Sequence, residues 1–216
     1  MMSELALRRQ IVATARRMND VGLNRGTSGN VSARSGRGFL VTPSGLPCED
    51  MRPADIVAMS SKGVARGKLA PSTEWRFHRD IYVARPDVGA IVHAHSMFAT
   101  TMACLRRGIP PFNYMVAVAG GSDIRCAAYA TFGTQALSDR ALAALEARNA
   151  CLLANHGMIA LGKSLDAAFA LAVEVEALAE QYWRALQLGT PHLLSDDEMD
   201  IVLEKFRTYG TRSSRR

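Results

Sequence analysis

Three histidines and one glutamate have the residue types and spacing expected of a metal site. His93 and His95 end an apolar run, His156 follows a second apolar run, and Glu74 precedes both. In an extended strand, side chains at i and i+2 leave the same face, so both imidazoles of the pair would point to one side. Three neutral imidazoles and one carboxylate are a donor set that Zn²⁺ accepts. These residues predict a metalloenzyme.

An isolated H-x-H pair also has a simpler interpretation. Histidines at strand ends are often hydrogen-bonded core or surface residues without a metal. Spacing alone does not show that Glu74 and His156 approach the pair. The zinc hypothesis therefore depends on the elements that position these side chains.

Apolar periodicity and turn residues predict helices alternating with short strands. The expected helices cover about 3–21, with Ser3 as N-cap, 72–84, with Ser72 or Thr73 as cap, 97–105 and 164–188, and a further helix begins at the capping box of Ser195 and Glu198. The expected strands cover about 31–34, 38–42, 56–59, 88–95, 150–154 and 158–161. We therefore expect one α/β domain over residues 1–216, with 211–216 as a flexible tail.

Composition and charge restrict the class of protein. The chain has 216 residues, of which 48% are hydrophobic and 21% charged, as in globular domains. The net charge is +6, but Arg212, Arg215 and Arg216 supply three of these charges. No basic helix face is apparent, so we expect no nucleic-acid partner. The four cysteines form no C-x-x-C pair, and no long apolar run occurs, so we expect a cytoplasmic protein that does not enter membranes.

Three short turns carry hydroxyl groups and glycine. They are Gly26-Thr27-Ser28-Gly29-Asn30, Thr42-Pro43-Ser44-Gly45 and Pro71-Ser72-Thr73. Glycine lets backbone N–H groups approach an anion, so these turns are compatible with a phosphate site, although each is also an ordinary turn sequence. A G-K-[ST] phosphate loop and a G-x-S-x-G nucleophile elbow are absent, and three of the four lysines lie in polar surroundings that disfavour a Schiff base.

Together these motifs resemble the class II aldolase/adducin family. The resemblance covers residues 22–32, 42–45, 72–78, 93–95 and 155–157, and it extends to 129–134 and 203–210. It implies a three-layer α/β/α sandwich with a central, mostly antiparallel mixed sheet. It also implies homotetramers with active sites between subunits.

The resemblance assigns roles to individual positions. It implies one Zn²⁺ per subunit, held by Glu74, His93, His95 and His156, with Glu74 also acting as the catalytic base. It implies phosphate binding by Gly29, Asn30, Ser44, Gly45, Ser72 and Thr73. Tyr114 would be a proton donor supplied by a neighbouring subunit, and Phe132 and Tyr209 would line an aldehyde pocket.

The implied reaction is the reversible aldol cleavage of a phosphorylated sugar. The expected substrate is a ketose 1-phosphate, foremost L-fuculose 1-phosphate, which gives dihydroxyacetone phosphate and L-lactaldehyde. Residues around the ligands also resemble forms seen in relatives, including the epimerase branch. A pentulose-5-phosphate 4-epimerase, a methylthioribulose-1-phosphate dehydratase and a sugar-acid phosphate decarboxylase, all on the same fold, remain open. Glu74 favours an aldolase, since the epimerases have a shorter carboxylate there. Adducin-like interaction modules lack the catalytic set, whereas all four metal candidates are present here.

Overall fold

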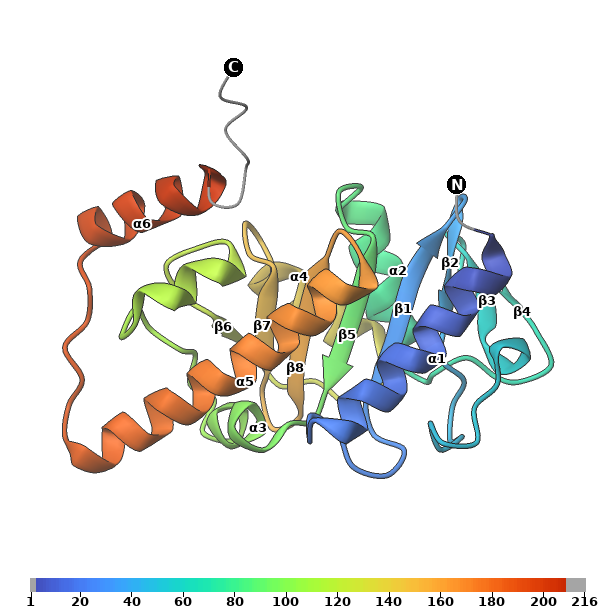
Figure 1. The fold of residues 1–216 in the computed structure, drawn as a ribbon, viewed down its shortest axis with the longest axis horizontal. Helices are drawn as coiled ribbons and strands as arrows, with labels where there is room; N and C mark the ends of the chain where they lie inside the picture. The colour runs from blue at the N-terminus through green and yellow to red at the C-terminus, as the bar shows by residue number, and fades with distance from the viewer. Residues whose placement is uncertain (1–2, 209–216) are drawn as a thin grey trace, which may run out of the picture.

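The central feature of the computed structural model, which describes residues 3–208, is one eight-stranded sheet (Figure 1). Its strand order is β4-β3-β2-β1-β5-β8-β7-β6. Neighbouring strands are antiparallel, except for the parallel pair β6 and β7. The strands are β1 (Asn30–Ser35), β2 (Gly38–Val41), β3 (Val57–Ser60), β4 (Ala65–Arg66), β5 (Ala90–Ala94), β6 (Arg125–Ala127), β7 (Ala150–Leu153) and β8 (Gly157–Gly162).

Helices cover both faces of this sheet. The helices are α1 (Glu4–Asp20), α2 (Trp75–Ala84), α3 (Met97–Cys104), α4 (Gln135–Ala144), α5 (Leu165–Leu188) and α6 (Asp196–Thr208), with short 3₁₀ helices η1 (Pro53–Asp55) and η2 (Tyr114–Ala119). Figure 1 shows α1 and α5 in front of the sheet and α2 and α4 behind it. The expected three-layer sandwich with a mostly antiparallel mixed sheet is confirmed.

Two apolar cores follow from the alternation of side chains along the strands. In β5, Ala90 and Val92 pack with α1, α3 and α5, whereas Ile91 packs with α2 and α4. His93 continues this alternation on the side of α2 and is fully buried. The strand therefore carries the first imidazole into the layer between the sheet and α2.

Local capping explains where several helices begin. The hydroxyl oxygen of Ser3 accepts a hydrogen bond from the backbone N–H of Ala6, and that of Ser164 accepts one from Ala167. Ser195 and Glu198 form a reciprocal capping box at the start of α6. These three starts were predicted from the sequence and are confirmed.

The start of α2 differs from the prediction. Neither Ser72 nor Thr73 is the N-cap residue, because a turn joins the carbonyl of Ser72 to the N–H of Trp75, and the helix begins only at Trp75. Glu74 occupies the N-cap position, and its side chain makes no capping hydrogen bond. This arrangement leaves the Glu74 carboxylate available to the site.

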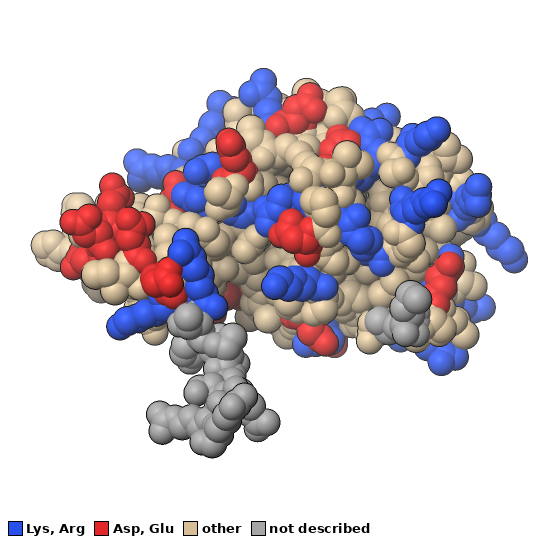
Figure 2. All heavy atoms as spheres, turned by 90° about the horizontal axis from the view of Figure 1, so that it is seen from above, with Lys and Arg blue, Asp and Glu red and all other residues tan. Residues whose placement is uncertain are grey.

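Charges of both signs lie on the face seen from above. Figure 2 shows Lys and Arg side chains interspersed with Asp and Glu over most of this face, with a group of acidic side chains at its left end. Within the described part of the chain, no helix is long and apolar enough to cross a membrane. The predicted pocket residue Tyr209 and the predicted tail 211–216 lie outside the described residues.

Candidate metal centre and substrate cavity

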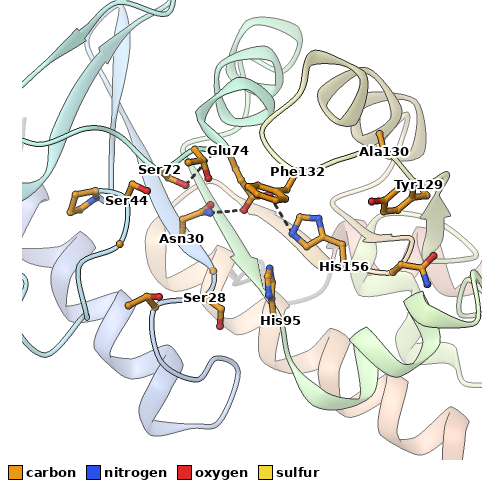
Figure 3. Close-up of a pocket in the computed structure, with 16 residues that line it drawn as sticks. Ser28, Asn30, Ser44, Ser72, Glu74, His95, Tyr129, Ala130, Phe132 and His156 are labelled. Carbon is orange, nitrogen blue, oxygen red and sulfur yellow. Dashed lines mark hydrogen bonds and ion pairs between the residues drawn. The ribbon is translucent and has the colours of Figure 1, made fainter.

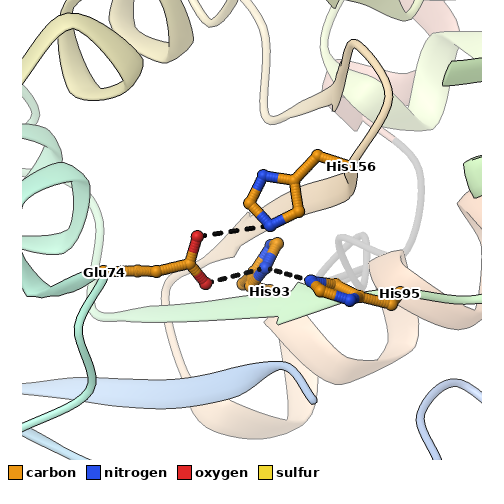
Figure 4. Close-up of side chains that lie close together, drawn as sticks. All are labelled: Glu74, His93, His95 and His156. Atoms are coloured by element: carbon orange, nitrogen blue, oxygen red, sulfur yellow. Dashed lines mark hydrogen bonds and ion pairs between the residues drawn. The ribbon is translucent and has the colours of Figure 1, made fainter. Parts of the chain in front are cut away.

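Four side chains from three parts of the chain converge at the carboxyl end of β5 (Figure 4). The Nε2 atom of His93 lies 2.9 Å from Nε2 of His95 and 3.0 Å from Oε2 of Glu74. The Nε2 atom of His156 lies 3.3 Å from Oε1 of Glu74. Ligand atoms of a tetrahedral zinc site are about 3.3 Å apart when each bond is about 2.0–2.1 Å. The cluster therefore has the size of a single-ion site.

The orientation of His93 is fixed by the neighbouring strand. Its Nδ1 atom lies 2.9 Å from the carbonyl oxygen of Met158 in β8. Because a carbonyl only accepts, Nδ1 carries the proton, and in the neutral ring Nε2 keeps its lone pair. A backbone acceptor behind a ligating imidazole is the usual arrangement in metal sites.

The chemistry of the donor set fits a cation. With neutral imidazoles, the atoms that face the centre of the cluster can all be acceptors, and like acceptors repel one another. Oε1 of Glu74 is buried and receives no hydrogen bond from a described residue. A divalent ion would satisfy all of these atoms together.

Burial and neighbouring charges set the pKa values in the cluster. Burial, and then the charge of His93, lowers the pKa of His95 to about 3 and that of His156 to about 4. Burial opposes ionisation of Glu74, but His93 and His156 outweigh it and hold the pKa of this carboxyl well below its ordinary value. Burial likewise opposes the charging of His93, but Glu74 outweighs it and raises the His93 pKa. Two imidazoles and a carboxylate are thus in their ligating forms at neutral pH.

Backbone packing holds His95 and His156 in place. The backbone N–H of His95 donates to Oδ1 of Asn24 at 2.9 Å. His156 lies in the turn between β7 and β8, after Asn155, whose φ of 56° is left-handed. A Cβ atom on Gly157 would lie 3.0 Å from Cδ2 of His95 and 2.4 Å from the carbonyl oxygen of Ala94. Only glycine allows this turn to approach β5 so closely.

The three hydroxyl-bearing turns also meet at the site. The N–H of Ser72 donates to the carbonyl of Thr42, and the N–H of Ser44 donates to that of Ala70. Thr42 in turn exchanges hydrogen bonds with Val31, just after the first turn. Backbone pairing therefore brings together segments that the sequence separates by about forty residues.

We call the four side chains of Glu74, His93, His95 and His156 the metal cluster, meaning a cluster of candidate ligands for one ion. A cavity of about 370 Å³ joins the three turns to this cluster (Figure 3). Its volume is in the range of small-molecule sites. Predicted residues that line it are Gly29, Asn30, Ser44, Gly45, Ser72, Thr73, Glu74, Phe132, His95 and His156. The structure also adds Thr27, Ser28, Pro43, Tyr129, Ala130 and Asn155.

The two sides of the cavity differ in chemistry. Hydroxyl and amide groups of Asn30, Ser44 and Ser72 face its polar side, and Ser72 and Asn30 each keep a donor hydrogen beyond those used in their internal bonds. Tyr129, Ala130 and Phe132 supply a less polar wall near His156. The cavity can hold an anionic group at one end and an apolar group at the other.

Tyr114 is not brought into this cavity by its own chain. It begins η2 and is 55% exposed. Sequence reasoning also missed the buried partners of the site, including His78 and Asn24, which are part of the resemblance but carry no ligand-like pattern of their own. The spacing of Glu74, His78 and Tyr82, four residues apart, is the signal that indicates a shared helix face.

Comparison with a family model gives a match to the Class II Aldolase and Adducin N-terminal domain over residues 9–183. A 5-methylthioribulose-1-phosphate/5-deoxyribulose-1-phosphate aldolase of Rhodospirillum rubrum is 61% identical over 208 residues, which are 96% of this chain and 94% of the relative. An L-fuculose phosphate aldolase of Escherichia coli is 47% identical over 207 residues, 95% of this chain and 96% of the relative.

The fold is likewise similar to that of a solved structure. An L-fuculose 1-phosphate aldolase structure superposes with a TM-score of 0.91 at 39% identity, covering 96% of this chain and 98% of that chain. The family match over residues 9–183 includes all the strands of the sheet and the segments that carry the four clustered side chains.

Proposed function

Since the chain belongs to the class II aldolase and adducin family, whose aldolases are metal-dependent, we propose that it catalyses the reversible aldol cleavage of a ketose 1-phosphate. The products would be dihydroxyacetone phosphate and an aldehyde. One observation carries the proposal: Glu74, His95 and His156 of the four-residue cluster line the same cavity as the hydroxyl-bearing turns. That juxtaposition suits a substrate with a phosphate close to a reacting carbonyl.

We infer that the resident ion is zinc, one per subunit, held by Glu74, His93, His95 and His156. Three imidazole nitrogens and one carboxylate oxygen suit zinc better than magnesium or calcium, which prefer oxygen ligands. When bound, the ion supplies Lewis-acid stabilisation of the negative charge that carbon–carbon cleavage leaves on dihydroxyacetone phosphate.

Glu74 is the proposed base of the reaction. Its carboxylate lies at the junction of the metal cluster and the cavity and stays ionised, because its pKa is held well below the ordinary value by His93 and His156 against the effect of burial. In the condensation direction the Glu74 carboxylate would remove a proton from the carbon next to the carbonyl of dihydroxyacetone phosphate. In the cleavage direction the C4 hydroxyl would lose its proton as the C3–C4 bond breaks, and Glu74, after taking up one proton from solvent, would deliver it to C3. Positioned proton transfer of this kind contributes about 10²–10⁴ in rate.

The polar turns are the proposed phosphate site. Ser44, Ser72, Thr73 and Asn30 would donate from their side chains, and the left-handed backbones of Gly29 and Gly45 turn the loops toward the cavity. Phosphate binding there holds the substrate in one orientation, which reduces the entropic part of the barrier.

Tyr114 is the proposed proton donor to the aldehyde oxygen, acting from a neighbouring subunit of a homotetramer. Its exposure and its absence from the cavity of its own chain fit a residue that serves another copy. Oligomers with cyclic symmetry repeat such a contact at every subunit.

The names of the relatives support a choice among ketose 1-phosphate substrates. The sequence resemblance favours L-fuculose 1-phosphate, but the relative at 61% identity acts, by its name, on 5-methylthioribulose 1-phosphate and 5-deoxyribulose 1-phosphate. All three are ketose 1-phosphates that yield dihydroxyacetone phosphate on cleavage between C3 and C4. We propose that the two ribulose derivatives are the preferred substrates, because their C5 carries no hydroxyl group and suits the wall of Tyr129, Ala130 and Phe132 better than the hydroxyl-bearing C5 of L-fuculose 1-phosphate.

Parallel kinetics would test this order. Zinc-loaded protein is incubated separately with the three sugar phosphates, and dihydroxyacetone phosphate is measured with a coupled reductase. We expect kcat/KM to be highest for a ribulose derivative and measurable for L-fuculose 1-phosphate. L-ribulose 5-phosphate is the control: its conversion to a 4-epimer, together with no cleavage of the 1-phosphates, would contradict the proposal.

A further inference from the structure

A row of buried polar side chains connects β1 to α2 behind the metal cluster. Asn30 Nδ2 lies 3.0 Å from Glu74 Oε2, and Asn30 Oδ1 lies 2.5 Å from His78 Nε2. Ser32 Oγ lies 2.7 Å from His78 Nδ1 and 2.9 Å from the hydroxyl of Tyr82. None of these five residues is more than 6% exposed. We call this row of five residues the Glu74–Tyr82 row.

The similar rise along α2 and β1 explains why side chains of the helix and of the strand meet repeatedly along the row. Glu74 at the N-cap and His78 and Tyr82 within α2 are four residues apart and lie on one side of the helix. Asn30 and Ser32 are two residues apart and share one face of β1. Four helical residues advance by about 6 Å, and two strand residues advance by about 6.6 Å. Side chains from helix and strand therefore alternate along the row.

The direction of every hydrogen bond follows from Glu74. An ionised carboxylate only accepts, so the amide nitrogen of Asn30 must face it. The amide oxygen of Asn30 then needs a donor, which Nε2–H of His78 supplies. In a neutral His78 ring, Nδ1 accepts from the Ser32 hydroxyl, whose oxygen in turn accepts from Tyr82.

Asn30 also lines the substrate cavity, so the orientation of its amide affects both the contact with Glu74 and the hydrogen bonds that a ligand can form. One amide hydrogen is used by Glu74, and the other remains for a ligand in the cavity. If the amide turned over, its oxygen would face the Glu74 carboxylate or an anionic phosphate, and both contacts are repulsive. His78 is the donor that opposes this turn.

We propose that His78 is a positioning residue that fixes the Asn30 amide and, through it, the Glu74 carboxylate and one donor of the phosphate site. The proposal rests on the proposed function, because it assigns His78 to the metal and phosphate sites named there. His78 is 0% exposed and reaches neither the cavity nor the metal cluster directly. Its hydrogen bond to Asn30 is the polar contact that leads from His78 to Glu74 and to the cavity.

Three substitutions at His78 separate this role from simple packing. His78→Gln keeps a donor near the position of Nε2, His78→Asn keeps a polar atom near Nδ1 only, and His78→Phe keeps the ring without a donor. Ser138→Ala is the matched control, since the buried Ser138 hydroxyl joins α4 to Asp80 on α2 by a 2.6 Å hydrogen bond outside the row. Zinc affinity is measured by competition with a chromophoric chelator, KM with the preferred sugar phosphate, and folding by thermal unfolding.

We expect His78→Phe and His78→Asn to weaken zinc binding by about tenfold, the lower end of the effect of losing a direct outer partner of a metal ligand, because Asn30 lies between His78 and Glu74. Their KM should rise, and His78→Gln should recover most of both losses. Ser138→Ala should lower the unfolding temperature without changing zinc affinity.

Equal zinc affinity and KM in His78→Gln and His78→Asn would overturn the positioning role, even if His78→Phe did not fold. Unchanged zinc affinity and KM in a folded His78→Phe would do the same. Normal zinc binding with no cleavage of any sugar phosphate would instead overturn the substrate assignment, while the pattern of affinities would still support the role of His78. Failure of the wild-type protein to bind zinc would overturn both proposals.

Discussion

The hydroxyl of Ser96, the residue after His95, donates a hydrogen bond to the carboxylate of Glu176 at 2.6 Å. The same carboxylate accepts from the backbone N–H groups of Phe98 and Ala99 in the first turn of α3. Negative charge is favourable at a helix N-terminus, where N–H groups lack partners. Helix α5 thereby holds the segment that carries one imidazole of the metal cluster.

Glu176→Gln should weaken both the fold and metal binding. The amide nitrogen of glutamine would face at least one of the three donors, and a buried donor without an acceptor costs about 1–3 kcal/mol. We expect the urea midpoint and the zinc affinity to fall together. Glu174→Gln removes the same charge two residues earlier on α5 and is the control. Equal effects of the two substitutions would show that charge on α5, rather than the anchor at Ser96, is responsible.

Glu74→Gln tests the proposed base. The substitution keeps an oxygen for the metal and removes the group that exchanges the proton, so kcat should fall by about 10²–10⁴. Zinc bound per subunit, measured by plasma emission, should remain substantial because three imidazoles are left. Turnover close to that of the wild type would exclude Glu74 as the base.

Gly29→Ala should be more damaging than Gly26→Ala. Both glycines have left-handed φ, 74° and 62°, so alanine is strained at either position. A Cβ atom at Gly29 would lie 2.2 Å from Nδ2 of Asn24, whereas one at Gly26 would meet nothing within 4 Å. Asn24 accepts from the N–H of His95, so the disturbance would extend to the metal cluster.

Urea unfolding of the two glycine variants gives the comparison. We expect the excess loss for Gly29→Ala to be about 1–3 kcal/mol, the usual cost of overpacking. Its zinc affinity should also decline, while that of Gly26→Ala should not. Similar losses in both variants would mean that backbone strain dominates and that Asn24 adapts without consequence.

Tyr114 allows a test of action between subunits. Tyr114→Phe and Glu74→Gln, each of which we expect to be nearly inactive alone, are denatured together in equal amounts and refolded. If Tyr114 serves a neighbouring site in a cyclic oligomer, random mixing restores about a quarter of the sites. Separately refolded variants mixed afterwards are the control. No recovered activity in the co-refolded sample would contradict action from a neighbouring subunit.

The parts of this protein that sequence could predict are those fixed by local rules. The i, i+2 spacing of His93 and His95 indicated two rings on one side of a strand, and Ser3, Ser164 and Ser195 indicated helix starts. The fold class and family followed from motifs spread over the chain. These signals depend on neighbouring residues or on resemblance, and both are present in the sequence itself.

Other features depend on contacts between distant segments. No element was predicted over 106–149, where the structure has η2, the three-residue β6 and α4. These elements pack against segments distant in the sequence: η2 against α5 and α6, β6 against β7, and α4 against α2. The pairing of Asn30 with His93 across β1 and β5 is a matter of strand register, which spacing does not specify. The hydrogen bonds of the Glu74–Tyr82 row depend on that register and on the position of α2.

Removal and return of the metal test the central claim most directly. The protein is stripped of metal with a chelator, dialysed, and assayed for dihydroxyacetone phosphate from 5-deoxyribulose 1-phosphate before and after addition of one equivalent of Zn²⁺. We predict almost no product from the stripped protein and recovery of activity in proportion to added zinc, up to one ion per subunit. Undiminished cleavage by protein shown to contain no divalent metal, or no cleavage after zinc has rebound, would contradict a metal-dependent aldolase.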